Sequence, residues 1–528
     1  MRLSTLLFAL FRFLIPPALI FTTYLYLYPA AHGCSFPEAR QAQAACIVPG
    51  QQKAYTPPEV APFRLLALGD PQLEGDTSLP DPDAVVFPSL LGLRESVRED
   101  GLEGLKGVLE DLVKRDLVTV LHGYRKRLDL WGNDLYLAHI YRSVFWWTDP
   151  THTVVLGDLL GSQWIGDDEF QRRTDRFWKR VFKGGEKVSS AITDVNGRRG
   201  VLGKDEDWKR RIIAVAGNHD IGYAGDIHER RIERFENAFG RVNWNIRFRL
   251  ESNGSNSASS PPRLHMASPL ETQDPELHLI ILNSMNLDDP ALRPNLQQDS
   301  RDFIDAQLRP STAESTTTGT ILLTHIPFHK EAGVCIDAPY FSYFPQDQGG
   351  GIREQNHLSK HVTDHILNGL ARSATGNAIV LNGHDHEGCD TTHHLFTSYI
   401  SDLDIDTSID TAVWTANHTL LSTLNPPPSD VTSNSVREIT VRSMMGSFGG
   451  NAGLLSAWFD HEAGEWHFAY DVCVLGVQHI WWAVHVLDLI VFGLGVASLM
   501  AEIVEAFVMR EGQEDEVGGR DGGKVKKA

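Results

Sequence analysis

Short apolar runs recur through the middle of the chain, and each run ends in turn-forming Gly, Asn, Asp or Thr. The runs are rich in branched and aliphatic side chains, which is typical of buried β-strands. The strands predicted in this way are Phe63–Leu68, Thr153–Leu156, Ile212–Ala216, Leu277–Leu282, Ile321–Leu323 and Ala378–Leu381.

Helix-like segments separate several of these strands, and the alternation predicts an α/β core. The expected helices are Leu102–Arg115, Tyr124–Tyr141, Asp168–Val181 and Glu229–Phe239. Three later runs follow one another without helices, so we expect antiparallel strands that close a second sheet. These runs are Glu438–Met445, Leu454–Phe459 and Trp466–Cys473.

Two polar stretches, 252–262 and 401–436, are rich in Ser, Thr, Asn, Asp and Pro, and we expect exposed loops there. Residues 31–61 contain Pro and Gln and are expected to form a stem. A single large domain, 62–475, is then expected to hold the core.

Both ends of the chain are apolar. Residues 3–28 are long enough to cross a bilayer, which requires about 20 residues. A signal peptide cut near residues 28–31 is the alternative, but the run is long for one, so 1–30 is predicted to be a retained anchor. A second span is predicted within 476–502. His485 and Asp488 lie inside this span, and we expect them to face the other helix or to lie near the membrane surface. The alternative is that they make a functional polar contact.

Charge and tail sequence bear on partners and topology. The chain has 48 Lys+Arg and 68 Asp+Glu, a net −20, without a basic stripe, so nucleic acid is not an expected partner. The tail, 503–528, carries Lys524 and Lys526 at the positions of a dilysine-type retrieval signal read by cytosolic coat proteins. A cytosolic tail places the middle of the chain in a lumen, where Asn253 and Asn417 are glycosylation acceptors in loop-like sequence.

The five cysteines form no CxxC pattern, so a thiolate metal site is not expected. Cys335 and Cys389 follow two histidines of the candidate site closely, and an oxidising lumen would permit their bond. Cys34 with Cys46 is a weaker candidate pair, and a free buried thiol is the alternative for each.

Five polar clusters, each at the end of a predicted strand, carry the candidate chemistry. Carboxylate, amide and imidazole groups are ligands of hard and borderline divalent metals. The seven candidate ligands are Asp70, Gln72, Asp158, Asn218, His325, His384 and His386. Seven ligands suit two metal ions better than one, and two ions a few Å apart form a clamp for in-line attack on phosphorus.

Individual roles follow from chemistry and position. Asp158 is the natural bridging carboxylate. His219 is the candidate general acid for a leaving alkoxide. Asp220 either orients His219 or makes a local turn bond. A single histidine such as His325 is more often structural than a ligand, but five clusters in order make coincidence an unsatisfactory explanation.

These motifs resemble the calcineurin-like metallophosphoesterase superfamily, with its pattern D-x-H, G-D-x-x-D, G-N-H-D/E, H and G-H-x-H. The resemblance implies a two-sheet αββα sandwich over residues 62–475. It implies one metal on Asp70, Gln72, Asp158 and His386, and another on Asp158, Asn218, His325 and His384. The chain departs from the pattern at Gln72, where the superfamily usually has His, and at Gly161, where a second Asp would fall.

Asp-Pro-Gln is similar to a narrower group, the fungal endoplasmic reticulum phosphodiesterases that remodel GPI anchors. Further likenesses are Gly132–Tyr136, Met444–Gly446 and Phe448–Asn451. The likeness implies a multi-pass membrane protein of the endoplasmic reticulum, cycling to the early Golgi, with a lumenal site. It implies manganese, and removal of ethanolamine phosphate from a mannose, the second one, of GPI-anchored glycolipid. The alternatives are another lumenal phosphoesterase and a non-catalytic cargo receptor for GPI-anchored proteins.

Overall fold

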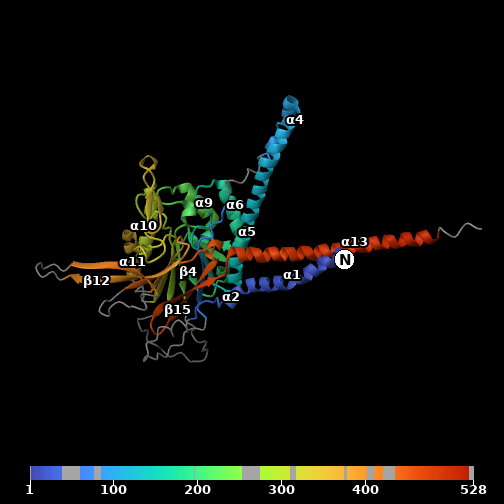
Figure 1. Cartoon of the computed structure of the whole chain (residues 1–528). Coiled ribbons are helices and arrows are strands. Elements are labelled where there is room, and N and C mark those ends of the chain that lie inside the picture. The colour runs from blue at the N-terminus through green and yellow to red at the C-terminus, as the bar shows by residue number, and fades with distance from the viewer. Residues whose placement is uncertain are drawn as a thin grey trace, which may run out of the picture. The chain divides into compact units, whose positions relative to one another are not determined.

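The structure is a computed structural model of the 528-residue chain. It describes residues 2–38, 60–75, 85–195, 197–251, 274–309, 317–373, 377–400, 409–419 and 434–521. The chain forms two compact units. Residues 34–475 form the larger unit, with two mixed β-sheets, and residues 1–33 with 476–528 form the smaller one (Figure 1).

The first sheet joins the early strands of the larger unit to its last two strands. β1 runs parallel to β2, which runs parallel to β5, while β15 pairs antiparallel with the other side of β1. In sheet order the strands are β16 (Glu465–Val474), β15 (Asn451–Asp460), β1 (Phe63–Leu68), β2 (His152–Val155), β5 (Arg211–Ala214) and β3 (Glu186–Lys187). The expectation that 454–459 and 466–473 close a second sheet is therefore wrong, because β15 takes the free edge of β1 instead.

The second sheet has a parallel centre of β7, β8, β11 and β14. Antiparallel strands β6 and β12 flank this centre. In sheet order the strands are β13 (Ile409–His418), β12 (Cys389–Ile400), β14 (Ser435–Thr440), β11 (Ala378–Asn382), β8 (Thr318–Leu323), β7 (Glu276–Ile281), β6 (Trp244–Arg249) and β4 (Arg198–Val201). The apolar runs predicted as strands between residues 277 and 381 all lie in this sheet. A separate hairpin pairs β9 (Phe341–Tyr343) with β10 (Ile352–Gln355).

One hydrophobic core is shared by the two sheets. Phe63 and Leu65 of β1 lie in the same buried cluster as Leu279 of β7 and Ile321 of β8. All four side chains are fully buried. Burial of this apolar surface is the main stabilising contribution to the larger unit.

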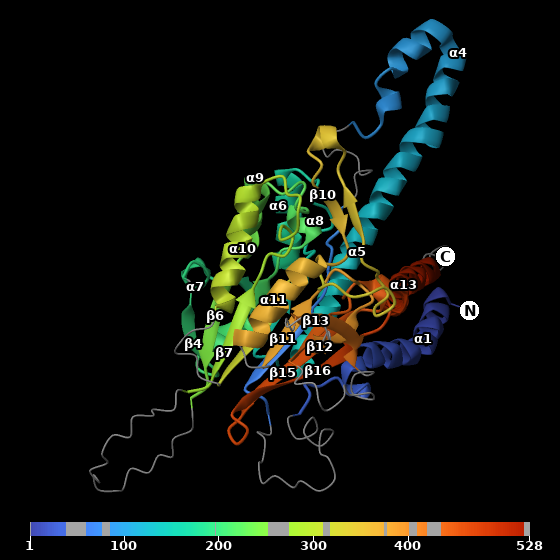
Figure 2. The same ribbon diagram turned by 90° about the vertical axis from the view of Figure 1, so that its left-hand side faces the viewer.

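Helices cover the sheets of the larger unit and form the smaller one. They are α1 (Leu3–Tyr26), α2 (Tyr28–Ala31), α4 (Leu93–Asp111), α5 (Leu117–Thr148), α6 (Asp167–Arg176), α7 (Ser190–Thr193), α8 (Asn218–Ile221), α9 (Glu229–Phe239), α10 (Pro294–Leu308), α11 (Lys360–Ser373) and α13 (Gln478–Asp521). Figure 2 shows α10 and α11 lying over the second sheet. There Asn368 Oδ1 of α11 accepts a hydrogen bond from Trp414 Nε1 of β13 at 2.9 Å.

Residues 93–148 are helical almost throughout. A π-helical turn, η2 (Leu112–Asp116), joins α4 to α5. The expectation of separate helices at 102–115 and 124–141 is wrong for the intervening residues. The sequence between them contains no proline, so nothing in it interrupts the backbone hydrogen bonds.

Part of the polar stretch 401–436 is a strand rather than a loop. β13 spans Ile409–His418 and pairs antiparallel with β12. Asn417 therefore lies on an edge strand, with its side chain exposed, and not in a loop. Residues 401–408 and 420–433 of that stretch, Asn253, and most of the predicted stem lie outside the described residues.

Two disulfides are present. Cys335–Cys389 is confirmed, with a Cα–Cα distance of 5.9 Å. The pairing of Cys34 with Cys46 is wrong, because Cys34 bonds to Cys473 across 439 residues of sequence. Cys46 lies outside the described residues. A pairing between the two ends of the unit depends on where β16 lies, which cysteine spacing does not reveal.

The smaller unit pairs α1 with α13. Both helices are long and apolar enough to cross a membrane, over Leu3–Tyr26 and Gln478–Arg510. Thr22 Oγ1 donates to Asp488 Oδ2 at 2.8 Å, and Tyr26 Oη lies 3.4 Å from His485 Nε2. The expectation that the two polar residues of the second helix face the first helix is thus confirmed.

Candidate metal centre

The structure brings the polar clusters of both sheets together at the carboxyl ends of their strands. Parallel strands end at one edge of a sheet, so the loops after them collect there. Asp70, Asp158 and Asn218 follow strands β1, β2 and β5 of the first sheet. His325 follows β8, and His384 with His386 follows β11, both from the second sheet.

Two groups of ligand atoms lie close enough to hold metal ions. The first contains Asp70, Asp158 and His386, and the second contains Asp158, His325 and His384. Within each group the ligand atoms lie within 4.8 Å of one another. Asp158 belongs to both groups, so one carboxylate is shared between two adjacent candidate sites.

Glycines permit this close approach. A Cβ at Gly157 would lie 2.1 Å from His325 Nδ1. A Cβ at Gly217 would lie 2.2 Å from the backbone nitrogen of Asp158. Glycine at these two positions therefore has a steric reason that involves the candidate ligands themselves.

The backbone of the site is strained. Asp70, Gln72, Asp158 and His384 have φ values of 45°, 39°, 50° and 73°, in the left-handed region that non-glycine residues seldom occupy. Asp149 is the one other non-glycine residue with positive φ in the part of the chain that the structure describes. Each such residue costs about 1–3 kcal/mol, and clustering of this strain is a feature of functional sites.

Backbone carbonyl groups fix the tautomers of two histidines. His325 Nδ1 lies 2.7 Å from Leu156 O, and His384 Nε2 lies 2.9 Å from Gln355 O. Each of these nitrogens must carry the proton, because a carbonyl only accepts. His325 Nε2 and His384 Nδ1 both face Asn218 Oδ1, each at 3.0 Å.

The protonation of each ring decides whether its second nitrogen can donate to Asn218 Oδ1. Burial, followed by repulsion from His325, lowers the pKa of His384 to about 3, so this ring is neutral at physiological pH. Burial alone lowers the pKa of His325, but Asp158 raises it to about 9. His325 is therefore protonated at both nitrogens and can donate from Nε2, whereas the lone pair of neutral His384 Nδ1 faces the lone pairs of Asn218 Oδ1. A divalent metal between these two atoms would relieve their repulsion.

The buried carboxylates of the site also lack a hydrogen-bonding partner for one of their oxygens. Asp70 Oδ1 accepts a bond from the His384 backbone at 3.0 Å, whereas Asp70 Oδ2 is buried without a hydrogen-bond partner. Burial raises the pKa of Asp70 to about 8, and Asp158 adds to the rise. Burial also raises the pKa of Asp158, but His219 and His325 outweigh it and hold that pKa below its usual range. An orphaned buried carboxylate oxygen beside this donor set fits a metal site.

Gln72 reaches the site with its amide nitrogen. Gln72 Nε2 lies 3.0 Å from Asp158 Oδ2 and 3.0 Å from His386 Nε2. An amide nitrogen does not bind metals, so the expected ligand atom, Oε1, would face the site only after a half-turn of the amide group. Without a metal, the neighbouring acceptors favour Gln72 Nε2 on the inner side of the amide group. A bound cation would favour Oε1 there instead.

Histidine in place of Gln72 should tighten metal binding. An imidazole offers a lone pair to the metal, whereas the Gln72 amide must first rotate and give up the hydrogen bonds of Nε2. For Gln72→His we expect the affinity for Mn²⁺ to rise about tenfold or more. Calorimetric titration of the full chain in detergent measures it, with Gln72→Ala as the partner variant. Equal or weaker binding by Gln72→His would show that position 72 is not a ligand position.

His219 lies at the rim of the site. Its side chain is one-third exposed, and Nε2 is 3.7 Å from Asp158 Oδ2. Asp220, expected to orient His219, instead accepts backbone bonds from Gly217 at 2.9 Å and from Leu159 and Leu160 at 3.2 and 3.0 Å. Burial, reinforced by Asp158, raises the pKa of Asp220 to about 7. Asp220 thus makes one local turn bond, from Gly217, as in the alternative interpretation, and its bonds from Leu159 and Leu160 tie the Asp158 loop to the Asn218 loop.

Several residues of the site carry no sequence signal. Ser284 Oγ accepts from the backbone of Ile326 at 2.9 Å and holds the His325 turn. Ser443 Oγ donates to Asp70 O at 3.1 Å. Phe448 packs its ring 4.8 Å from that of His386, and only its place in the Phe448–Asn451 likeness pointed to it.

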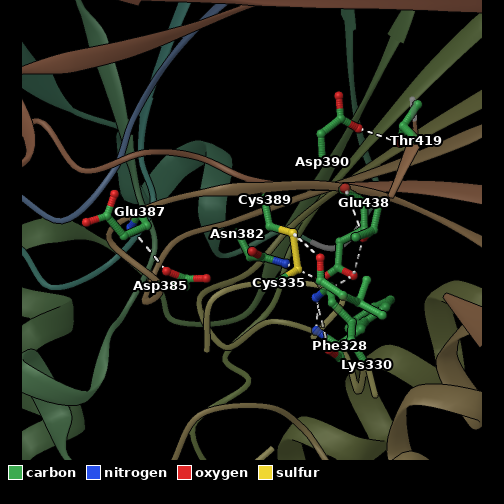
Figure 3. Close-up of a disulfide and its surroundings, with 12 residues drawn as sticks. Phe328, Lys330, Cys335, Asn382, Asp385, Glu387, Cys389, Asp390, Thr419 and Glu438 are labelled. Atoms are coloured by element: carbon green, nitrogen blue, oxygen red, sulfur yellow. Dashed lines mark hydrogen bonds and ion pairs between the residues drawn. A yellow bond between two sulfur atoms is a disulfide. The ribbon is translucent and has the colours of Figure 1, made fainter. Parts of the chain in front are cut away.

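A buried charge network supports the two histidine loops (Figure 3). Glu438 of β14 is fully buried, and its Oε2 pairs with Lys330 Nζ at 2.9 Å and His393 Nε2 at 2.6 Å. Its Oε1 accepts from the backbone of Phe328 at 2.8 Å and from Asn382 Nδ2 at 2.6 Å. Burial alone raises the pKa of Glu438, but Lys330, followed by His393, lowers it below its usual range.

Phe328 comes three residues after His325, and Asn382 comes two before His384, so Glu438 connects both ligand loops. The Cys335–Cys389 disulfide joins the same two segments farther along the chain. Neither Glu438 nor Lys330 stands in a recognisable motif, because their importance comes from burial.

The chain is similar to known proteins over most of its length. Protein TED1 of Saccharomyces cerevisiae is 31% identical over 405 residues, which are 68% of this chain and 75% of TED1. An uncharacterized protein of Schizosaccharomyces pombe is 28% identical over 423 residues, which are 76% of this chain and 89% of that protein. The chain matches no protein-family profile.

Among solved structures, the chain is similar to GAP50, the anchor in the inner membrane complex of Plasmodium. The alignment covers 67% of this chain and 70% of GAP50, with 10% sequence identity and a TM-score of 0.28.

Proposed function

The chain belongs to the family of Saccharomyces cerevisiae Protein TED1, and from this premise we propose a metal-dependent phosphodiesterase anchored in the endoplasmic reticulum membrane. Its substrate is the GPI glycan, and it removes the ethanolamine phosphate attached to the second mannose of that glycan. The observation that carries the proposal is that Asp158 belongs to two ligand groups at once. A carboxylate shared by two sites is what a pair of adjacent metal ions requires.

The residues present fit two divalent ions, manganese in this proposal. Such ions supply Lewis acidity at the phosphoryl oxygens and a nucleophile at neutral pH. One would be held by Asp70, Gln72, Asp158 and His386, and the other by Asp158, Asn218, His325 and His384. His219, exposed at the rim, would donate a proton to the leaving alkoxide. Asp220 would hold the loops that carry Asp158 and Asn218.

The remaining architecture supports the proposal. Two mixed sheets with one shared core are compatible with an αββα sandwich over 62–475. The paired apolar helices support anchors in 1–30 and 476–502, with a stem at 31–61. The tail, 503–528, would reach cytosolic coat proteins through its lysines, and the enzyme would cycle to the early Golgi. A substrate linked to lipid suits an enzyme held at the membrane.

The test is the GPI glycan of cells whose one copy of this protein is His384→Ala. Mass spectrometry should find the side-branch ethanolamine phosphate retained, as in cells lacking the protein. His365→Ala is the matched control, because His365 lies on the surface of α11, paired with Asp305. Normal trimming of the glycan by His384→Ala would refute the assignment.

The two alternatives predict different results. If the protein is another phosphoesterase, purified His384→Ala loses hydrolysis of a generic phosphodiester while the glycan stays normal in its absence. If it is a cargo receptor, GPI-protein export depends on the chain but not on His384. The presence of a competent residue at every ligand position favours the enzyme.

A lumenal site predicts that Asn417 carries glycan, because its side chain is exposed on edge strand β13. Digestion with an endoglycosidase should increase the electrophoretic mobility of both chains. The shift of the wild-type chain should exceed that of Asn417→Gln by the amount that one glycan contributes. Thr415→Val, a neutral change two residues away on the same strand, should keep the glycan. Identical mobility of wild type and Asn417→Gln would argue against the lumenal placement.

A further inference from the structure

One part of α5 extends beyond the sheets of the larger unit. Figures 1 and 2 show α4 and the adjoining half of α5 projecting away from β-strands that the rest of α5 contacts. We name the segment Leu117–Trp131 the α5 arm. From Gly132 onward, most α5 side chains are buried in the larger unit, so the helix is fixed at that end.

The α5 arm exposes a continuous apolar stripe. Its members follow one another at alternating spacings of four and three residues, which places them on one helix face. They are Leu117, Leu121, Tyr124, Leu128 and Trp131, with 41%, 59%, 63%, 54% and 46% of their surface exposed. Five large apolar side chains in one exposed row are far more than single surface hydrophobics, and such a patch marks an interaction site.

Basic residues flank the stripe. Residues 114–131 contain five Lys or Arg and two Asp, whereas the whole chain has a net charge of −20. Arg125 and Arg127 adjoin the stripe on its two sides, and the Arg127 guanidinium lies 5.8 Å from the Tyr124 ring centroid. Of the two acids, Asp116 is buried and accepts a bond from Ser89 N at 2.8 Å, whereas Asp129 is exposed with Oδ2 3.7 Å from Arg125 Nε, so the exposed charge of residues 114–131 is still net positive.

The charges decide between two kinds of apolar partner. In an antiparallel helix pair between two copies, Arg125 and Arg127 would flank the seam and each would face its counterpart in the other copy, which disfavours that self-pairing. In a bilayer, leucine, tyrosine and tryptophan enter the boundary between headgroups and acyl chains. The flanking arginines then reach lipid phosphates with their guanidinium groups.

The chain itself keeps a bilayer within reach. The larger unit continues into the two span-capable helices at both of its ends, after Gly33 and before Gly476. Cys34 and Cys473 are disulfide-bonded with Cα atoms 5.2 Å apart, so both connections leave from one place. A surface tethered in this way meets the membrane at high effective concentration and needs little intrinsic affinity.

We propose that the α5 arm is a membrane-surface helix that binds phospholipid. Leu117, Leu121 and Leu128 enter the bilayer interface together with Tyr124 and Trp131, while Arg125 and Arg127 contact phosphates. The inference concerns the surface of the larger unit and stands whether or not the metal centre hydrolyses phosphodiesters.

Lipid photo-crosslinking tests the proposal. The full chain is reconstituted in nanodiscs that contain a phospholipid with a diazirine in its acyl chain, irradiated and mapped by peptide mass spectrometry. Adducts are expected on 117–131 as well as on α1. The double variant Leu121→Glu/Leu128→Glu should reduce arm adducts at least about tenfold, with α1 adducts unchanged. Thr119→Glu, on the opposite helix face by spacing, should retain them.

The substituted leucines are exposed, so folding of the double variant is not at stake, and Trp131→Ala provides a second, milder reduction. Arm adducts that persist in the double variant, or α1 adducts without arm adducts, would overturn the proposal. Mass photometry separates one specific alternative. A dimer that the double variant converts to a monomer would identify the stripe as a contact between copies, which also overturns lipid binding.

Discussion

Asp158→Asn should reduce phosphodiester hydrolysis by about 10³-fold or more while the chain remains folded. Asp158 is the one carboxylate in both ligand groups, so its loss affects both candidate ions. Lewis-acid stabilisation is worth several kcal/mol, and each 1.4 kcal/mol is a factor of ten in rate. In the wild type the backbone N–H of His219 donates a hydrogen bond to Asp158 Oδ1 at 2.9 Å, and the side-chain oxygen of asparagine can accept the same bond. The measurement is turnover of bis(p-nitrophenyl) phosphate with Mn²⁺ present.

Asp175→Asn is the matched control, because Asp175 lies on the surface of α6 in an ion pair with Lys179. It should keep wild-type turnover. Asp158→Asn relieves repulsion with Asp70 but also removes the attraction of Asp158 for His219 and His325, so circular dichroism of the metal-free variant must show that it is folded. Turnover by Asp158→Asn within tenfold of wild type would mean that hydrolysis does not depend on a shared carboxylate.

Lys330→Met should destabilise the larger unit by about 3–5 kcal/mol, the usual effect of removing one member of a buried ion pair. Lys330 is 1% exposed, and its partner Glu438 is fully buried. The variant leaves a buried carboxylate with His393 Nε2, at 2.6 Å from its Oε2, as its remaining ring partner. Denaturant unfolding of the full chain in detergent, followed by tryptophan fluorescence, measures the change.

Two further variants separate charge from packing. Lys330→Met combined with Glu438→Gln should recover much of the loss, because no charge is then left buried alone. Lys179→Met, which removes the exposed ion pair with Asp175 of α6, should change the stability little. Destabilisation of the double variant equal to the sum of the single variants would show that Lys330 and Glu438 act independently.

The candidate ligands were predictable because the rule that places them is local. Each lies within a few residues of an apolar strand, and parallel strands of one sheet end at the same edge. Asp70 and Asp158 could be placed together from β1 and β2 alone. His325 and His384 join them from the second sheet because the two sheets share one core. The order of the motifs indicated that these histidines reach the same site, whereas the periodicity of apolar residues alone did not.

Other features depend on long-range contacts that local patterns do not contain. β13 is rich in Thr, Asp and Asn and resembles a loop until β12 supplies a partner strand. The bond of Cys34 to Cys473 requires the final strand to lie beside the start of the unit. In the sequence Glu438 resembles an ordinary strand residue, and only its burial shows that Lys330, His393, Phe328 and Asn382 all donate to it. Asp220 illustrates the opposite case, since the plainer expectation of backbone bonding describes it correctly.

The number of metal ions bound per chain is the decisive measurement for a binuclear centre. The full chain, purified in detergent, is saturated with Mn²⁺, freed of excess ion and measured by elemental analysis, with electron paramagnetic resonance on the same sample. A binuclear centre should bind two Mn²⁺ per chain with a spin-coupled signal, and Asp158→Asn should retain at most one uncoupled ion. One or no ion in the wild-type chain, or two without coupling, would contradict a binuclear centre built on Asp158.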